Sequence, residues 1–581
     1  MKELLVYIKE YTKECILGPF FKLLEACFDL AVPLVMASVI DKGIASGDKG
    51  YIFKYGGILI LLAVIGLTCS ITAQFFAAKA ATGFAANVRY ALFKHIESLS
   101  FTEMDGIGTS TMITRMTSDI NQLQSGVNMA LRLFLRSPFI VFGAAVMAFT
   151  IDVKAAVVFV IVIPLLAIVI FGIMLASMPL FKKVQARLDN VMGITRQNLT
   201  GVRVIRAFNK EAAEIENFAD GNGKLAAMQL FVGRISALAN PVTYVMVNIA
   251  LIALLWTGGI QVDAGNLTQG EIVALVNYMS QILVELVKLA NTIVLSTKAV
   301  ACGGRVQAIL AVQSSMEEGD YSGNGSMDTQ DADDTARTKG GLEVEFEHAS
   351  MMYKGAGADS VSDISFTAGA GSVTGIIGGT GSGKSTLVNL IPRFYDVSEG
   401  CVKVGGRDVK SYKLDTLRQA VGIVLQKSVL FRGTIRDNIL WGNPDATDEE
   451  VTEALKAAQA WEIVQGKEKG LDYVIEQGGR NLSGGQKQRL AIARALVRKP
   501  PVLVFDDSSS ALDFATEAKL RKSLQELGYN PTIFIVSQRT SSIQHADNIL
   551  VLEDGALAGQ GTHEELVNNC EVYKEIYNSQ S

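Results

Sequence analysis

The chain has 581 residues, too many for one hydrophobic core, and its 49% hydrophobic and 19% charged residues are unusual for a wholly soluble protein. A net charge of -5 gives no overall basic bias toward nucleic acid, and six scattered cysteines without a CxxC pair favour neither a zinc site nor a disulfide framework. We therefore expect a protein with a membrane portion and no nucleic-acid partner.

The first half of the chain contains stretches long enough to cross a membrane. A helix needs about 20 mostly apolar residues to cross a hydrocarbon core about 30 Å thick. We predict membrane-spanning helices near residues 16–40, 54–78, 127–150, 155–180, 236–260 and 271–297. The last of them is interrupted by Glu285 and Lys288.

The connections between these spans differ in length and charge. Those after the second and fourth spans are long and rich in Lys and Arg, and by the positive-inside tendency they face the cytoplasm together with both termini. Their apolar residues recur at helical spacing, as in residues 201–211. We expect the spans to continue beyond the membrane as long intracellular helices that dock on another domain, with charged solvated loops as the alternative.

Two pairs of charged residues fall inside predicted spans. Glu25 and Asp29 lie one helical turn apart on the first span, and Arg132 and Arg136 do so on the third. Charges inside a membrane are expensive and are often functional. We expect salt-bridged packing or snorkelling to the interface for each pair, with substrate contact as the alternative.

The character of the chain changes after residue 312. Residues 313–341 are acidic and polar with almost no large apolar side chain, which predicts a flexible linker. Residues 342–581 alternate short β-rich runs with helical segments, a pattern typical of an α/β domain. We predict four strands from these runs, at residues 373–377, 502–506, 532–536 and 548–552. The predicted organisation is therefore an all-α six-helix transmembrane domain over residues 1–312, the linker, and an α/β domain with a phosphate-binding loop over residues 342–581.

One short segment of the second domain carries the strongest motif. Residues 378–386 read GGTGSGKST and satisfy the pattern GxxxxGK followed by Ser or Thr. The glycines let successive backbone N–H groups turn toward phosphate oxygens, while the lysine reaches the β- and γ-phosphates and the serine ligates Mg²⁺. We expect nucleotide-binding roles for Gly378, Gly379, Thr380, Gly381, Ser382, Gly383, Lys384, Ser385 and Thr386.

A second element follows the phosphate-binding loop by about 120 residues. Residues 501–506 form an apolar strand that ends in Asp506. A carboxylate at this place is suited to holding Mg²⁺ through its water shell.

A third segment, residues 482–486, reads LSGGQ and precedes a basic helical run. It resembles the signature sequence of ATP-binding-cassette (ABC) proteins. The resemblance extends to recurring elements of the six-span exporter subfamily, which match Pro33, residues 41–44 (DKGI) and residues 204–208 (VIRAF). The chain is thus identified as a multidrug-exporter-like ABC half-transporter. The resemblance implies coupling helices near residues 100–110 and 208–218, where the intracellular helices meet the ATPase domains.

The same resemblance assigns further roles. Tyr353 matches the aromatic residue that stacks on adenine, and Gln426 matches a glutamine that contacts Mg²⁺. Residues 510–513, which end in Asp513, match the inter-subunit loop. The implied Mg²⁺ ligands are Ser385, Gln426 and Asp506. The signature residues Ser483, Gly484, Gly485 and Gln486 are implied to act on the ATP of another subunit.

Two residues depart from the family pattern. Asp507 stands where the family has Glu, and the loss of one methylene retracts the carboxylate by about 1.5 Å. Because a misplacement of about 1 Å can lower a rate about 100-fold, we expect water activation to suffer. Gln538 stands where the family has His, and its neutral amide cannot change protonation. With the phosphate loop and signature intact, this combination favours a degenerate site in a heterodimer, in which hydrolysis occurs mainly at the partner's site. A homodimer is the alternative.

These features lead to a functional hypothesis. We expect an ATP-dependent exporter subunit of a bacterial inner membrane, paired with a second half-transporter that carries the missing Glu and His. The expected substrate is a small hydrophobic or amphipathic compound, drug-like or lipid-like. A regulatory or channel-like subunit, in which ATP binding sets a population of open states, is the alternative.

Overall fold

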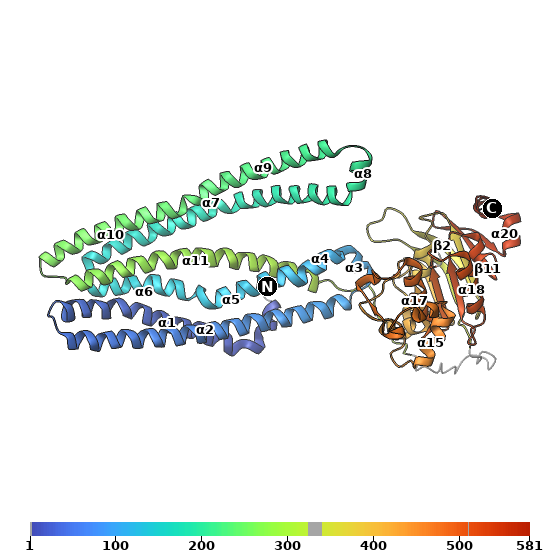
Figure 1. Ribbon diagram of the computed structural model, residues 1–581, viewed down its shortest axis with the longest axis horizontal. Coiled ribbons are helices and arrows are strands. Elements are labelled where there is room, and N and C mark those ends of the chain that lie inside the picture. Colours follow the sequence, from blue (N-terminus) through green and yellow to red (C-terminus); the bar gives the residue numbers. More distant parts are fainter. Residues whose placement is uncertain (1–2, 323–339, 509–510, 581) are drawn as a thin grey trace. The chain divides into compact units, whose positions relative to one another are not determined.

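The computed structural model describes residues 3–322, 340–508 and 511–580, which form two compact units. The first unit runs to Glu97 and resumes over Thr109–Val312, and the second comprises Ser98–Gly108 and the chain from Gln313 onward (Figure 1). The predicted boundary at residue 312 therefore agrees with this division, but residues 98–108 belong with the second unit. Most of the predicted linker, residues 323–339, lies outside the described residues.

The first unit consists of long helices. Six helical stretches of 42 to 53 residues are apolar enough to cross a membrane, and each contains one predicted span. The main helices are α1 (Thr12–Ser38), α2 (Lys49–Glu97), α5 (Ile120–Met129), α6 (Arg136–Ile151), α7 (Val153–Thr200), α9 (Glu211–Ala237), α10 (Ala239–Asp263) and α11 (Gln269–Leu310). Because about 20 residues suffice for a crossing, these stretches extend well beyond it, as expected.

Small side chains allow the first two spans to pack closely. On α2, Ala73, Ala77, Ala80 and Ala81 are fully buried, and a Cβ placed on Gly18 of α1 would lie 3.5 Å from the backbone nitrogen of Ala77. Such small residues let helix backbones approach in a membrane, where apolar burial gives little net drive.

Three π-helical segments interrupt the described helices of the first unit. The segments η2 (Val39–Ile44), η3 (Arg115–Asp119) and η4 (Ala130–Phe134) are π-helical, and η4 ends just before Arg136 begins α6. Asp41 of η2 accepts hydrogen bonds from the Gly270 backbone N–H at 2.7 Å and from the Thr268 hydroxyl at 2.5 Å. The sequence DKGI therefore anchors the end of the first span to the beginning of α11.

Two short helices interrupt the long ones. The helix α3 (Phe101–Ile107) lies where the first coupling helix is predicted, and it packs on the second unit. The Phe101 and Phe394 rings are 4.7 Å apart, and the Tyr395 hydroxyl donates to Asp105 at 2.6 Å. Burial and this hydrogen bond raise the pKa of the Tyr395 phenol.

The second coupling helix is predicted at residues 208–218, but the structure has a turn and the start of a long helix there instead of a separate short helix. The short helix is α8 (Val202–Ala207), and residues 211–218 begin the long helix α9. Asn209 adopts a left-handed conformation with φ of 51°, which ends α8, and Glu211 and Glu214 favour a helix start because their charges complement the N-terminal dipole. The apolar periodicity does not show this break.

The second unit contains two larger sheets. The six-stranded sheet has the order β12-β11-β3-β10-β9-β6, with all pairs parallel except β11 with β12. Its strands are β3 (Val373–Gly378), β6 (Val421–Val424), β9 (Val502–Asp506), β10 (Thr532–Val536), β11 (Asn548–Glu553) and β12 (Ala556–Gly561). The four strands predicted from sequence are all present, and the fold class is confirmed.

The other sheet is antiparallel in its described pairings and has the order β2-β1-β4-β5. Its strands are β1 (Val344–Met351), β2 (Val361–Ala368), β4 (Glu399–Val404) and β5 (Arg407–Asp408). Phe346 of β1 stacks on Phe366 of β2 with ring centroids 4.7 Å apart. Helices cover the sheets: α12 (Lys384–Leu390), α13 (Leu414–Ala420), α14 (Ile435–Leu440), α15 (Asp448–Ala457), α17 (Gly484–Leu496), α18 (Phe514–Gln525), α20 (His563–Asn569) and α21 (Glu571–Asn578).

The beginning of the predicted linker is held in place. Tyr321 donates its backbone N–H to Ser411 at 3.0 Å and accepts from Lys413 at 2.9 Å, while the Arg407 guanidinium lies 4.0 Å from its ring centroid. Tyr321 is therefore joined to the second unit, where backbone pairing and a cation–π contact offset the loss of chain entropy.

Candidate nucleotide-binding site

The phosphate loop follows the central parallel strand β3. This strand lies between β11 and β10, so the loop emerges at the carboxyl ends of the sheet, where α/β proteins bind ligands. Gly381 and Gly383 have φ of 86° and 89°, which a side chain would strain, and a Cβ at Gly383 would lie 2.4 Å from the Ser360 carbonyl oxygen. The glycines are thus required by the path of the loop, which ends at α12.

Lys384 lies within this loop. Its ammonium donates to the carbonyl oxygens of Gly378 at 2.9 Å and Gly379 at 2.5 Å. Burial lowers the pKa of the Lys384 ammonium, although Asp507 and Asp506 oppose the shift. A cation held among backbone carbonyls beside glycine amides can reorient toward phosphate oxygens.

Two of the predicted Mg²⁺ ligands are in direct contact. The Ser385 hydroxyl donates to Asp506 Oδ1 at 2.9 Å, which joins the start of α12 to the end of β9. Burial raises the pKa of the Asp506 carboxyl, while the Ser385 hydroxyl and Lys384 lower it. Hydroxyl and carboxylate oxygens are ligands that Mg²⁺ accepts together with water, so this pair fits such an ion.

The residues that depart from the family pattern share the cavity of the phosphate loop. This cavity has a volume of about 340 Å³, and both Asp507 and Gln538 line it. Gln426, which follows β6, donates its amide to Asp507 Oδ2 at 3.2 Å. Asp507 has φ of 45°, in the left-handed region that Asp tolerates better than most residues.

Tyr353 also lines the cavity. Its hydroxyl lies 3.1 Å from Thr386 Oγ1, and its ring meets that of Tyr395 edge-on at 5.1 Å. The structure thus brings together the phosphate loop, Tyr353, Gln426, Asp506, Asp507 and Gln538.

The signature residues lie apart from this group. Ser483 caps α17 in a reciprocal arrangement: its hydroxyl accepts from the Gln486 N–H at 3.3 Å, and Gln486 accepts from the Ser483 N–H at 3.0 Å. A Cβ at Gly485 would lie 2.9 Å from the Ala511 carbonyl oxygen. Within the described chain, residues 483–486 do not line the phosphate-loop cavity.

The predicted inter-subunit loop is only partly described. Ser510 lies outside the described residues, and Asp513 caps α18 by accepting the Thr516 N–H at 2.7 Å. This backbone hydrogen bond lowers the pKa of the Asp513 carboxyl.

Two glutamines contact the segments of the site although the sequence does not predict it. Gln580 donates to the Gln538 carbonyl oxygen at 2.7 Å and accepts from the Thr540 N–H at 2.9 Å. Gln488 of α17 donates to the Asp507 carbonyl oxygen at 3.4 Å. Both act on backbone atoms of distant segments, and no motif marks them.

Taken together, the six long apolar helices and the phosphate-loop sheet unit define a membrane protein joined to an ATP-binding domain. The family model for the ABC transporter transmembrane region matches residues 15–286, and that for the ABC transporter matches residues 361–510. The chain belongs to the ABC transporter family.

Individual relatives agree with this assignment. An uncharacterized ABC transporter ATP-binding protein of Mycobacterium tuberculosis is 36% identical over 99% of this chain and 97% of its own length. An ATP-dependent lipid A-core flippase of Desulfotalea psychrophila is 31% identical, covering 85% of this chain and 84% of its own. The solved structure of a bacterial Atm1-family ABC exporter with ATP bound has a TM-score of 0.79 at 22% identity, covers 98% of both chains and shares the fold.

Proposed function

We propose that this chain is one subunit of a heterodimeric ATP-driven exporter, and that its own nucleotide site binds ATP but hydrolyses it slowly. One observation carries the proposal: Asp507 and Gln538 line the same cavity as an intact phosphate loop. Groups that bind ATP and groups with a lowered ability to activate water thus occur at one site. A shortened carboxylate and a neutral amide favour retention of ATP over activation of water.

The proposed division of labour follows from the position of the signature. Since residues 483–486 lie outside the chain's own cavity, they are available to the nucleotide of another subunit. We place the efficient catalytic site on that partner, which supplies the Glu and His that this chain lacks. Ser385, Gln426 and Asp506 would hold Mg²⁺, which supplies charge neutralisation at the phosphates.

We further propose that the subunit lies in a bacterial inner membrane, with its ATPase unit in the cytoplasm, and exports an amphipathic compound. The basic connections between spans support this orientation. A relative that is named a lipid A-core flippase supports an amphipathic substrate.

Transport by inside-out vesicles that contain this chain and its partner tests the proposal. ATP should drive accumulation of an amphipathic fluorescent dye, and replacing the partner's catalytic Glu by Gln should abolish it. Accumulation that is unchanged by this replacement would rule out the pump and favour the regulatory alternative.

A further inference from the structure

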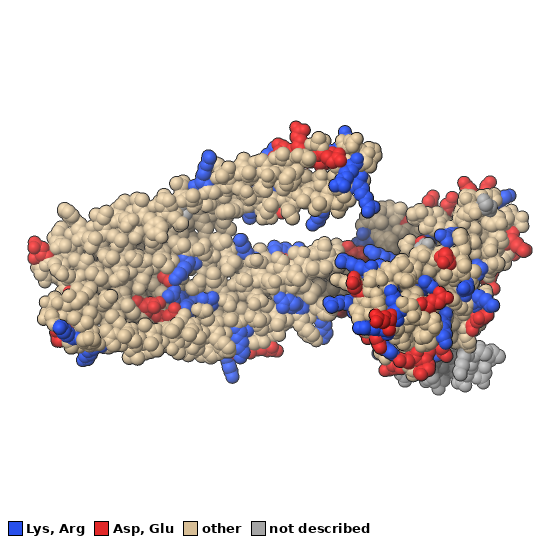
Figure 2. All heavy atoms as spheres, in the orientation of Figure 1, with Lys and Arg blue, Asp and Glu red and all other residues tan. Residues whose placement is uncertain are grey.

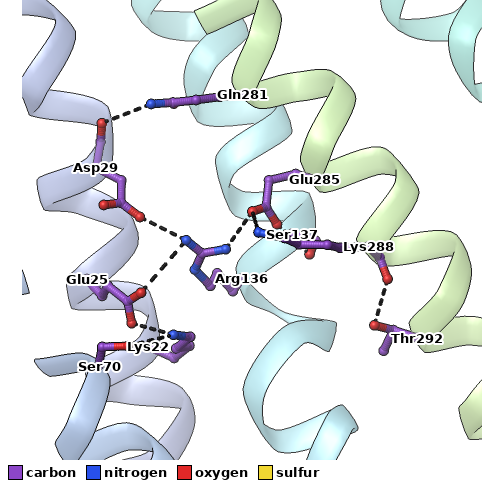
Figure 3. Close-up of polar contacts among 10 residues, drawn as sticks. All are labelled: Lys22, Glu25, Asp29, Ser70, Arg136, Ser137, Gln281, Glu285, Lys288 and Thr292. Carbon is purple, nitrogen blue, oxygen red and sulfur yellow. Dashed lines mark hydrogen bonds and ion pairs between the residues drawn. The ribbon is translucent and has the colours of Figure 1, made fainter. Parts of the chain in front are cut away.

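Charged side chains gather in the middle of the transmembrane unit, in an otherwise mostly uncharged surface (Figure 2). We call six of them the charge network, which joins helices α1, α6 and α11 (Figure 3). Its members are Lys22, Glu25, Asp29, Arg136, Glu285 and Lys288, three cations and three carboxylates.

Arg136 is the centre of the charge network. Its guanidinium contacts Glu285 Oε1 at 2.6 Å and Asp29 Oδ2 at 2.8 Å, with Glu25 at 3.8 Å. Ser137 adds a hydrogen bond to Glu285 Oε2 at 2.8 Å. The expectation of salt-bridged packing therefore holds for Arg136, whereas Arg132 is not a member and has a buried Nε without a hydrogen-bond partner among the described residues.

The members differ in exposure. The side chains of Arg136 and Glu285 are only 10% and 5% exposed, and they form a neutral buried pair. Asp29 is 39% exposed and Lys288 is 44% exposed. The groups that remain accessible are thus one carboxylate and one ammonium, on opposite sides of the buried pair (Figure 3).

These two accessible groups line one cavity of about 480 Å³. Val32, Pro33 and Met36 of α1 form part of an apolar wall of the same cavity. The cavity is therefore amphipathic, with opposite charges beside a hydrocarbon surface.

Two polar atoms in the cavity lining lack partners. Within the part of the chain that the structure describes, Arg136 Nε and Gln281 Oε1 are buried without a hydrogen bond. Buried polar groups are nearly always satisfied, so these two atoms are exceptions. Both are closed off from the cavity, and the charged groups open to a ligand are those of Asp29 and Lys288.

We propose that this cavity binds the headgroup of a zwitterionic amphiphile. The ligand's cationic group pairs with Asp29, its anionic group pairs with Lys288, and its apolar part lies along Val32, Pro33 and Met36. The buried Arg136–Glu285 pair holds the three helices in position without adding net charge. This inference rests on the proposed export function, because it defines the chemical class of the exported compound.

Binding of four amphiphiles with matched alkyl chains to the purified full-length chain, without nucleotide, tests the proposal. The probes are lysophosphatidylethanolamine, which is zwitterionic; lysophosphatidic acid, which is anionic; an alkyltrimethylammonium, which is cationic; and an uncharged alkyl alcohol. The zwitterion should bind about tenfold more tightly than any other probe. A hydrophobic dipeptide, which is also zwitterionic, is a further probe. Whichever of the lipid and the peptide binds more tightly identifies the source of the headgroup. Failure of both to bind overturns the proposal.

Two variants at the accessible groups separate recognition from packing. Asp29→Asn should weaken binding of the zwitterion and the cation about tenfold without weakening that of the anion. Lys288→Gln should weaken binding of the zwitterion and the anion without weakening that of the cation. The exposed residues Asp263 and Lys298 provide matched controls, and Asp263→Asn and Lys298→Gln should change no affinity.

Thermal unfolding of each variant, measured on the same samples, completes the test. A lowered unfolding temperature without any change in probe selectivity would assign the charge network to packing and overturn the proposal, as would equal binding of the zwitterionic and uncharged probes. ATP-dependent dye accumulation is measured separately: if it is intact while probe selectivity fails, only this inference fails, and if it is absent while selectivity holds, the export function fails.

Discussion

The ATPase unit contains two segments that differ in how closely they keep the ABC pattern. The signature segment, residues 482–486, is complete and caps α17, whereas the phosphate-loop cavity contains Asp507 and Gln538 in place of Glu and His. In the function proposed above, the signature segment acts on a partner's nucleotide and the phosphate-loop cavity holds this chain's own, so the two segments would have different tasks.

The largest expected effect comes from removing the cation of the phosphate loop. Lys384→Ala should lower the affinity of the chain for MgATP about 100-fold, because two or more charge-assisted contacts to phosphate are lost. Fluorescent-nucleotide titration of the purified chain measures this affinity.

Lys456, an exposed lysine of α15, provides the control, and Lys456→Ala should bind MgATP as the wild type does. Equal losses in both variants would mean that the phosphate loop does not hold the nucleotide of this chain.

A smaller effect is expected at the signature, and it concerns ATP turnover of the assembled pair rather than MgATP affinity of the chain. Ser483→Ala should leave the MgATP affinity of the isolated chain within about twofold of wild type but lower ATP turnover of the assembled pair about tenfold, since a hydroxyl donor to phosphate is lost. Loss of the cap on α17 also costs about 1 kcal/mol of stability, which a thermal unfolding curve detects.

Nucleotide affinity of the isolated chain is the deciding readout for Ser483→Ala. A large loss of affinity would place the signature in the chain's own site and remove the contrast between the two segments.

The smallest expected effect concerns the support of Gln538. Gln580→Ala removes two hydrogen bonds to the backbone of residues 538–540 and should change ATP turnover of the assembled pair about threefold with little change in MgATP affinity. Ser579→Ala, at the neighbouring position, serves as the control. Identical turnover in the two variants would show that α21 and its following residues do not position this loop.

Much of the fold could be predicted because its signals are local. Apolar stretches of membrane length, a glycine-rich loop after a strand and four β-rich runs each show within a few residues. The α8 position was missed because its end depends on the left-handed turn at Asn209, which apolar periodicity does not report.

The candidate site shows the same difference between local features and contacts of distant segments. The phosphate loop and signature are contiguous motifs, whereas the contacts of Gln580 with Gln538 and of Asp29 and Glu285 with Arg136 join distant segments. Helical spacing placed Glu25 with Asp29 and Arg132 with Arg136. It could not show which of the two arginines pairs with acids of two other helices, and among the described residues this is Arg136. Such pairings depend on tertiary packing, which a single sequence does not specify.

The central claim, that this chain's own site binds ATP but hydrolyses it slowly, is tested most directly by restoring the family residues. The wild-type chain is compared with the double variant Asp507→Glu, Gln538→His. MgATP affinity is measured on the purified chain, and ATP turnover is measured on the assembled pair whose partner carries Gln in place of its catalytic Glu. We predict similar affinity and a turnover about 100-fold higher in the double variant, as expected when a misplaced catalytic group is moved by about 1 Å. Wild-type turnover that already equals that of the double variant would contradict the account.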